Sequence, residues 1–176
     1  MSIFDRLKQS GLSELIRDQQ MKELLTRGEF RITEEYVHRE FLGTAADDDI
    51  RDLCLRFCDG HGELSGTVKK RLLPSISFAT RFGIQGVEFG RMGKRIYLQL
   101  QEVRPLDLSW VNERIIGRVP FLDYHSGLVT CDLARIPRIA ELLEYRVKGI
   151  KVADFLTIKE LAFREGELVG RLGFCL

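Results

Sequence analysis

The stretch that decides the fold runs from Asp49 to Arg104 and reads DIRDLCLRFCDGHGELSGTVKKRLLPSISFATRFGIQGVEFGRMGKRIYLQLQEVR. Four runs within it alternate apolar and polar residues, which predicts β-strands with one apolar and one wet face. Short turns join these runs, so consecutive strands are expected to pair antiparallel as a meander. The alternation slips across Gly86, where a β-bulge would bend the strand. The apolar positions are Leu53, Leu55, Phe57, Leu64, Val68, Ile76, Phe78, Phe82, Ile84, Ile96, Leu98 and Leu100.

An antiparallel sheet with a single apolar face must cover that face with helices, with a second sheet or with a ligand. The expected fold class is therefore α+β, with a long, curved antiparallel β-sheet of meander hairpins wrapped on helices. We divide the chain into an N-terminal amphipathic helix, residues 1–28, and a single curved-sheet domain, residues 29–176.

The flanking sequence predicts helices and two further hairpins. Residues 2–27 space their apolar side chains as a helix does, and this helix would pack on the domain, dock on a protein partner or lie at a membrane interface. Thr33 is the expected N-cap of a helix over 33–42, and other helices are expected over 109–116 and 137–147. Hairpins are expected over 121–131 and 155–174. Residues 62–68 (GELSGTV) resemble residues 166–172 (GELVGRL), so the last hairpin should join the same type of sheet.

Composition excludes several classes of protein. The 27 basic and 26 acidic residues nearly cancel, so the chain as a whole gives no electrostatic argument for nucleic acid. The four cysteines show no disulfide framework and are expected to be reduced thiols. Charges interrupt the N-terminal apolar residues and no stretch is long enough for a membrane span. These features favour a cytoplasmic protein, peripheral to the inner membrane if it binds one, or a periplasmic one if an export segment has been removed.

Motifs for catalysis are absent from the sequence. It contains no nucleophile elbow, phosphate loop, dinucleotide fingerprint or zinc-protease helix, so we expect no enzymatic activity and no cofactor. Cys54, Cys58 and His61 are the nearest approach to a metal site. Cys54 and Cys58 would lie about 13 Å apart on one strand, whereas two thiolates on one zinc ion lie about 4 Å apart, so metal binding is disfavoured.

Two basic clusters fall in predicted turns of the meander. Lys69, Lys70 and Arg71 precede the apolar pair Leu72 and Leu73, and Arg91, Lys94 and Arg95 surround the next turn. Each cluster is either a solvated turn or a contact with anionic lipid headgroups. In the second case Leu72 and Leu73 would enter the membrane interface.

The order of these elements resembles the tubular lipid-binding (TULIP-like) superfamily, and among its members the LmeA-like bacterial phospholipid-binding proteins. The likeness rests on the ITEEYV helix at 32–37, the GELSGTVK strand at 62–69, the Leu-Leu-Pro loop and the GVEFGRMGKRIYL segment at 86–98, with a looser match over 150–174. It implies a long curved sheet that shelters acyl chains, and no catalytic residue.

Two functions remain open at this point. In the first, the protein binds a lipid or another apolar ligand without catalysis, with each buried methylene contributing about 0.8 kcal/mol. In the second, the apolar face is covered by the chain itself and the protein is a structural or interaction module, with residues 2–27 recruiting a protein partner. An enzyme acting on small molecules is a weaker third reading. The residues expected to line the apolar site are Leu53, Leu55, Phe57, Ile76, Phe78, Phe82, Leu98 and Leu100.

Overall fold

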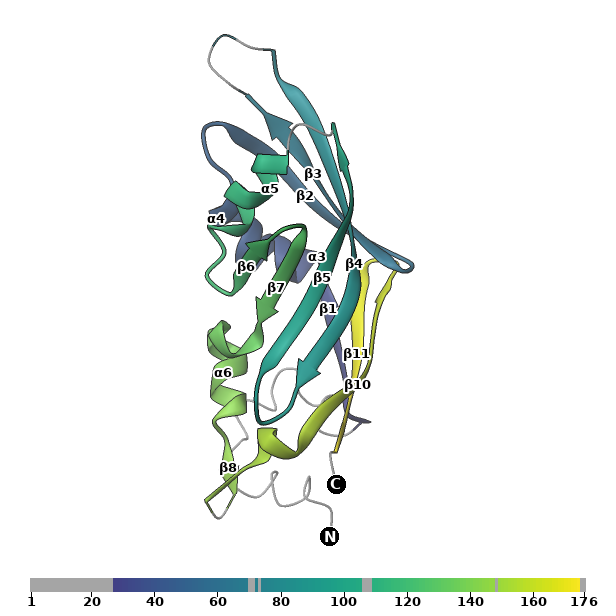
Figure 1. The fold of residues 1–176 in the computed structure, drawn as a ribbon, viewed down its shortest axis with the longest axis vertical. Helices are drawn as coiled ribbons and strands as arrows, with labels where there is room; N and C mark the ends of the chain where they lie inside the picture. Colours follow the sequence, from purple (N-terminus) through teal and green to yellow (C-terminus); the bar gives the residue numbers. More distant parts are fainter. Residues whose placement is uncertain (1–26, 70–71, 73, 106–108, 148, 175–176) are drawn as a thin grey trace.

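The computed structural model describes residues 27–69, 72, 74–105, 109–147 and 149–174. The molecule is elongated and consists mostly of antiparallel β-structure with a few short helices (Figure 1). The predicted helix over 2–27 lies outside the described residues.

The predicted meander is confirmed and forms most of a six-stranded sheet. Strands β2 (Ile50–Cys58), β3 (His61–Val68), β4 (Ile76–Phe89) and β5 (Lys94–Arg104) pair in sequence order, each antiparallel to the next. The register between β4 and β5 shifts between Ile84 and Gly86, so the predicted bulge is also confirmed. The predicted hairpin over 121–131 is present as β6 (Leu122–His125) and β7 (Leu128–Asp132), which extends the sheet beyond β5.

The last hairpin forms a separate sheet. Strands β10 (Leu156–Arg164) and β11 (Glu167–Phe174) pair with β1 (Glu29–Thr33) in the order β1-β11-β10. This sheet is antiparallel, like the first, but the two share no strand. Strand β1 was not predicted, although Phe30 and Ile32 alternate with Glu29 and Arg31 in the manner of a short strand.

The two similar hairpins meet each other at their turns. The amide of Gly60 donates to the carbonyl of Phe163 over 3.1 Å, and the amide of Gly166 donates to the carbonyl of Phe57 over 2.8 Å. The rings of Phe57 and Phe163 pack with their centroids 5.3 Å apart. Because the bonds are reciprocal, the hairpins are related by a local two-fold arrangement that equates Gly60 with Gly166. The sequence match aligned Gly166 with Gly62 instead of Gly60. The two alignments differ by two residues, and a shift of two residues along a strand keeps every side chain on the same face of the sheet.

The three helices predicted within the described residues are present, two of them with changed bounds. Thr33 caps α3 (Glu34–Val37), as expected, because its hydroxyl accepts from the amide of Tyr36 over 3.2 Å. The helical segment continues as η2 (His38–Leu42) to the predicted end and then beyond it as α4 (Gly43–Ala45). The helix predicted over 109–116 is present as α5 (Ser109–Ile116). The helix predicted over 137–147 ends earlier, as α6 (Pro137–Leu143), because Arg146–Val147 (β8) and Ile150–Lys151 (β9) form a small hairpin. The short helices η4 (Leu133–Arg135) and η5 (Val152–Phe155) complete the fold.

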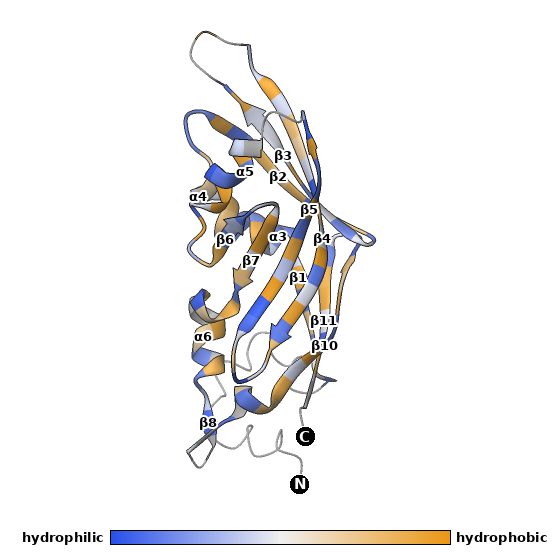
Figure 2. Ribbon diagram, viewed as in Figure 1, coloured by the Kyte–Doolittle hydropathy of each residue, from blue (hydrophilic) through white to orange (hydrophobic). Residues whose placement is uncertain are grey.

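The apolar face of the large sheet is covered in two places by different elements. At one end α5 and the Ala45–Ile50 region cover it, and the side chains there form the first core cluster with Val68, Phe78, Val111 and Ile115. Further along, the second sheet covers it, and Leu55, Phe57, Phe163 and Leu168 form the second core cluster. Figure 2 shows apolar and polar residues alternating along the strands. The sheet is therefore covered by a second sheet as well as by helices. The expected fold class named helices as the cover, and a second sheet was among the alternatives that the sequence left open.

A buried polar pair fixes α5 on the sheet. The Thr80 hydroxyl in β4 donates to the Asn112 side-chain oxygen over 2.8 Å, and both residues are almost fully buried. Beside them, Asp47 joins α5 to the start of β2: one carboxylate oxygen accepts from the amides of Asp49 and Ile50, and the other lies 2.7 Å from Arg114 and 2.5 Å from Arg118.

Candidate functional site

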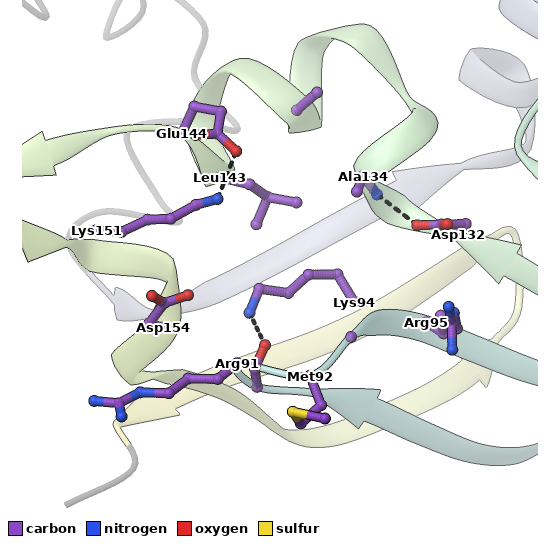
Figure 3. Close-up of a pocket in the computed structure, with 13 residues that line it drawn as sticks. Arg91, Met92, Lys94, Arg95, Asp132, Ala134, Leu143, Glu144, Lys151 and Asp154 are labelled. Carbon is purple, nitrogen blue, oxygen red and sulfur yellow. Dashed lines mark hydrogen bonds and ion pairs between the residues drawn. The ribbon is translucent and has the colours of Figure 1, made fainter.

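A pocket of about 260 Å³ lies beside the β4–β5 turn (Figure 3). The turn forms one wall, and the opposite wall comes from segments that lie 40 to 60 positions further along the chain. The turn residues are Gly90, Arg91, Met92, Gly93, Lys94 and Arg95, and the other lining residues are Asp132, Ala134, Ala140, Leu143, Glu144, Lys151 and Asp154.

Lys94 brings a buried positive charge to this pocket. The residue is only 9% exposed, its ammonium group donates to the carbonyl of Gly90, and the nitrogen lies 4.9 Å from the centroid of the Phe89 ring. An ammonium ion taken out of water is costly unless polar groups or aromatic faces replace its hydration. The turn therefore holds this cation at the pocket wall, and Figure 3 shows the side chain directed toward the part of the pocket that Lys151 and Asp154 line.

The remaining charges are partly matched within the protein. Lys151 lies 2.5 Å from Glu144, and this hydrogen bond and the charge of Lys151 lower the pKa of Glu144. Asp132 caps η4 by accepting from the amide of Ala134 over 3.1 Å. The guanidinium of Arg91 lies 5.5 Å from the centroid of the Phe155 ring.

The lining of the pocket is charged. Four cations face three carboxylates along its walls, so its charge favours an anionic group. Its lining residues include no hydroxyl, thiol or imidazole side chain, and its carboxylates and lysines belong to the groups that can act as acids or bases.

The eight residues predicted to line an apolar site lie elsewhere. None of them lines this pocket. Phe78 belongs to the first core cluster and Leu53 packs against it, whereas Leu55 and Phe57 belong to the second cluster and Phe82 and Leu98 pack against that one. Ile76 is 37% exposed, and Leu100 is half-buried. Their role as ligand contacts stays a prediction, although an acyl chain would have to displace side chains that already fill these clusters.

Two of the five predicted membrane-contact residues, Lys69 and Leu72, belong to the described part of the chain. Lys69 directly follows β3, whose last residue pairs with the first residue of β4, so it lies at the other end of β4 from the pocket. Lys69 is exposed and Leu72 is fully exposed. Lys70, Arg71 and Leu73 lie outside the described residues. Membrane contact through residues 69–73 stays a prediction.

The sequence singled out three of the thirteen residues that line the pocket. Arg91, Lys94 and Arg95 stood out as a basic turn, but Glu144, Lys151 and Asp154 did not. They come from a separate region, and nothing local in the sequence indicates that it folds against the turn. Cys54, Cys58 and Cys131 are free thiols, and in the described part of the chain no three His, Cys, Asp or Glu side chains are grouped as metal ligands.

No protein-family model, curated protein or solved structure matches this chain. Among the described residues, no helix combines the length and apolar character that crossing a membrane requires. The fold and the site together define an α+β protein whose large sheet packs its apolar face against α5 and a second sheet, with a charged pocket beside the β4–β5 turn.

Proposed function

We propose that this protein is a non-enzymatic binding protein that holds an anionic group of a small ligand, a phosphate or a carboxylate, in the pocket beside Lys94. The observation that carries the proposal is the buried ammonium of Lys94 at the pocket wall. Lysine binds phosphate as a point charge, and the low exposure of Lys94 strengthens that attraction.

The shape of the site supports a small ligand or a headgroup. A volume of about 260 Å³ lies just below the range of about 300–1,000 Å³ that drug-sized ligands occupy. Leu143 and Ala140 give one side of the pocket an apolar surface, which suits a ligand with a short carbon skeleton next to its acid group.

The cover of the apolar face bears on the choice between the two functions that the sequence left open. Because α5 covers one part of the apolar face and the second sheet covers another, this cover favours a module that binds through its surface. Acyl-chain binding along the sheet would need these elements to separate. Recruitment of a protein partner by residues 2–27 stays a prediction.

The test is isothermal titration calorimetry with inorganic phosphate and with glycerol 3-phosphate. Lys94→Met should weaken binding at least about tenfold, since a charge-assisted contact contributes about 1.5–3 kcal/mol. Arg91→Gln changes an exposed side chain and should weaken binding without affecting the fold. Lys69→Met, at the far end of the molecule, is the matched control and should bind as the wild type does. Absence of heat with both ligands, or equal affinity in Lys94→Met and Lys69→Met, would reject the site.

A further inference from the structure

Two exposed apolar side chains lie at or next to the pocket, because Met92 lines it and Phe155 directly follows the lining residue Asp154. Met92 lies at the tip of the β4–β5 turn and is 91% exposed, and Phe155 in η5 is 39% exposed. Arg91 joins them, because its guanidinium lies over the Phe155 ring. We call these three residues the rim.

The composition of the rim matches one kind of partner. A single exposed apolar residue is ordinary, but here two of them flank a pocket whose turn also supplies Arg91, Lys94 and Arg95. Apolar side chains enter the boundary between headgroups and acyl chains, and neighbouring cations attract anionic lipids. A soluble anion would use the cations but would leave Met92 without a role.

We propose that the rim docks on an anionic phospholipid surface and that the group which enters the pocket is the phosphate of a lipid headgroup. This inference rests on the proposed function, because it names the source of the anionic group. Met92 and Phe155 enter the interface, and Arg91 and Arg95 face the surrounding headgroups.

The length of β4 separates this surface from the other basic turn. The strand has 14 residues, which at about 3.3 Å per residue spans about 40 Å. In the chain, Leu72 precedes the first residue of β4 and Met92 follows its last residue. A flat membrane can therefore contact only one of the two turns in a given orientation of the protein. We assign this contact to the β4–β5 turn, which carries Met92.

Two variants that each carry a tryptophan as a fluorescent reporter show which end of β4 contacts the membrane. Trp110 is the single tryptophan of the chain, so Trp110→Phe provides a silent background for Met92→Trp and Leu72→Trp. Each full-length variant is mixed with vesicles of phosphatidylglycerol and phosphatidylcholine, and with vesicles of phosphatidylcholine alone. With the anionic vesicles, tryptophan at position 92 should shift its emission to the blue and be shielded from iodide, whereas tryptophan at position 72 should change in neither respect.

Co-sedimentation of the protein with vesicles, in variants that keep Trp110 and carry no added tryptophan, measures the affinity for the membrane. Met92→Asp should abolish binding to anionic vesicles, and Arg91→Gln should weaken it about fivefold, in line with the loss of one cation near a charged surface. Leu72→Asp, the matched control, should bind like the wild type. No binding to anionic vesicles overturns the inference, as does a response at position 72 instead of 92. If glycerol 3-phosphate binds in calorimetry while vesicles do not, the proposed function stands and only the membrane source is rejected. If vesicles bind through Met92 while Lys94→Met has no effect on either ligand, the pocket is rejected.

Discussion

Gly66→Ala is expected to destabilise the protein because the added methyl group has no room. A Cβ atom at this position would lie 2.9 Å from two ring atoms of Phe78 and 3.0 Å from the backbone oxygen of Arg51. Phe78 is only 4% exposed, so its ring cannot move without disturbing the first core cluster. Overpacking costs about 1–3 kcal/mol, whereas losing the flexibility of glycine in the unfolded chain returns about 0.4–1 kcal/mol. We expect a net loss of about 1–2 kcal/mol in the free energy of unfolding.

Urea denaturation followed by circular dichroism measures this loss. The matched control is Gly86→Ala, at the bulge in β4, where a Cβ atom would meet no other atom within 4 Å. It should leave stability unchanged or raise it by up to about 1 kcal/mol. In a double-mutant cycle with Phe78→Leu, the two substitutions should cost less together than the sum of their separate effects, because the shorter side chain makes room for the methyl group. Equal stability of Gly66→Ala and Gly86→Ala would refute the argument that Phe78 packs against the bare backbone.

Three other predictions address charges and packing. Asp47→Ala should cost about 2–4 kcal/mol, since it removes the acceptor for the amides of Asp49 and Ile50 and the ion-pair partner of two arginines. The control Asp123→Ala breaks an exposed ion pair with Arg135 and should change stability by less than about 0.5 kcal/mol. Equal losses in urea titrations would contradict this. Burial opposes the ionisation of Asp47, but the amides of Ile50 and Asp49 and the charges of Arg118 and Arg114 outweigh it and hold its pKa below the ordinary value of 3.8. The stabilisation is therefore complete above that value and is lost as the pH falls through the lower folded pKa, so stability in acid should fall less steeply in Asp47→Asn than in the wild type. Burial, with a contribution from Asp132, raises the pKa of the Cys131 thiol to about 12. Cys131 should therefore be alkylated more slowly at pH 8 than Cys54 or Cys58, as measured by peptide mapping with mass spectrometry. After denaturation in urea the three cysteines should react equally fast.

The meander could be predicted because its information is local. Alternating residues fix which side of each strand is apolar, and short turns such as Asp59-Gly60 fix which strands are neighbours. From the sequence of its own strand, Gly66 is expected to lower stability, because glycine weakens the interior of a strand. Its cross-strand partner Phe78 explains it, because the ring occupies the space above the glycine. Gly62 with Phe82 and Gly170 with Phe30 repeat this arrangement, which gives the sequence repeat a structural reason.

The arrangement of the last hairpin could not be predicted, because it depends on contacts between distant residues. Its period-two pattern fits either an added strand of the first sheet or a strand of a second one. What decides between them is the pairing of β11 with β1, residues that are more than 130 positions apart, together with the contact between Phe57 and Phe163. The pocket has the same origin: one basic turn was visible in the sequence, but the wall that makes it a pocket comes from α6, β9 and η5.

Strand β2 forms one edge of the large sheet, and contacts within the protein already occupy part of this edge. The Nε2 atom of His38 lies 2.9 Å from both the amide and the carbonyl of Leu55. The side chain of Glu34 accepts from the amide of Phe57, and Gly166 donates to the carbonyl of Phe57. His38 Nε2 pairs with either the amide or the carbonyl of Leu55, according to its tautomer, and both backbone groups of Phe57 are paired. A partner peptide would have to displace these contacts before it could extend the large sheet along this part of β2. The opposite edge of the sheet is formed by β6, so strand addition, if it occurs, is expected there rather than at Leu55 and Phe57.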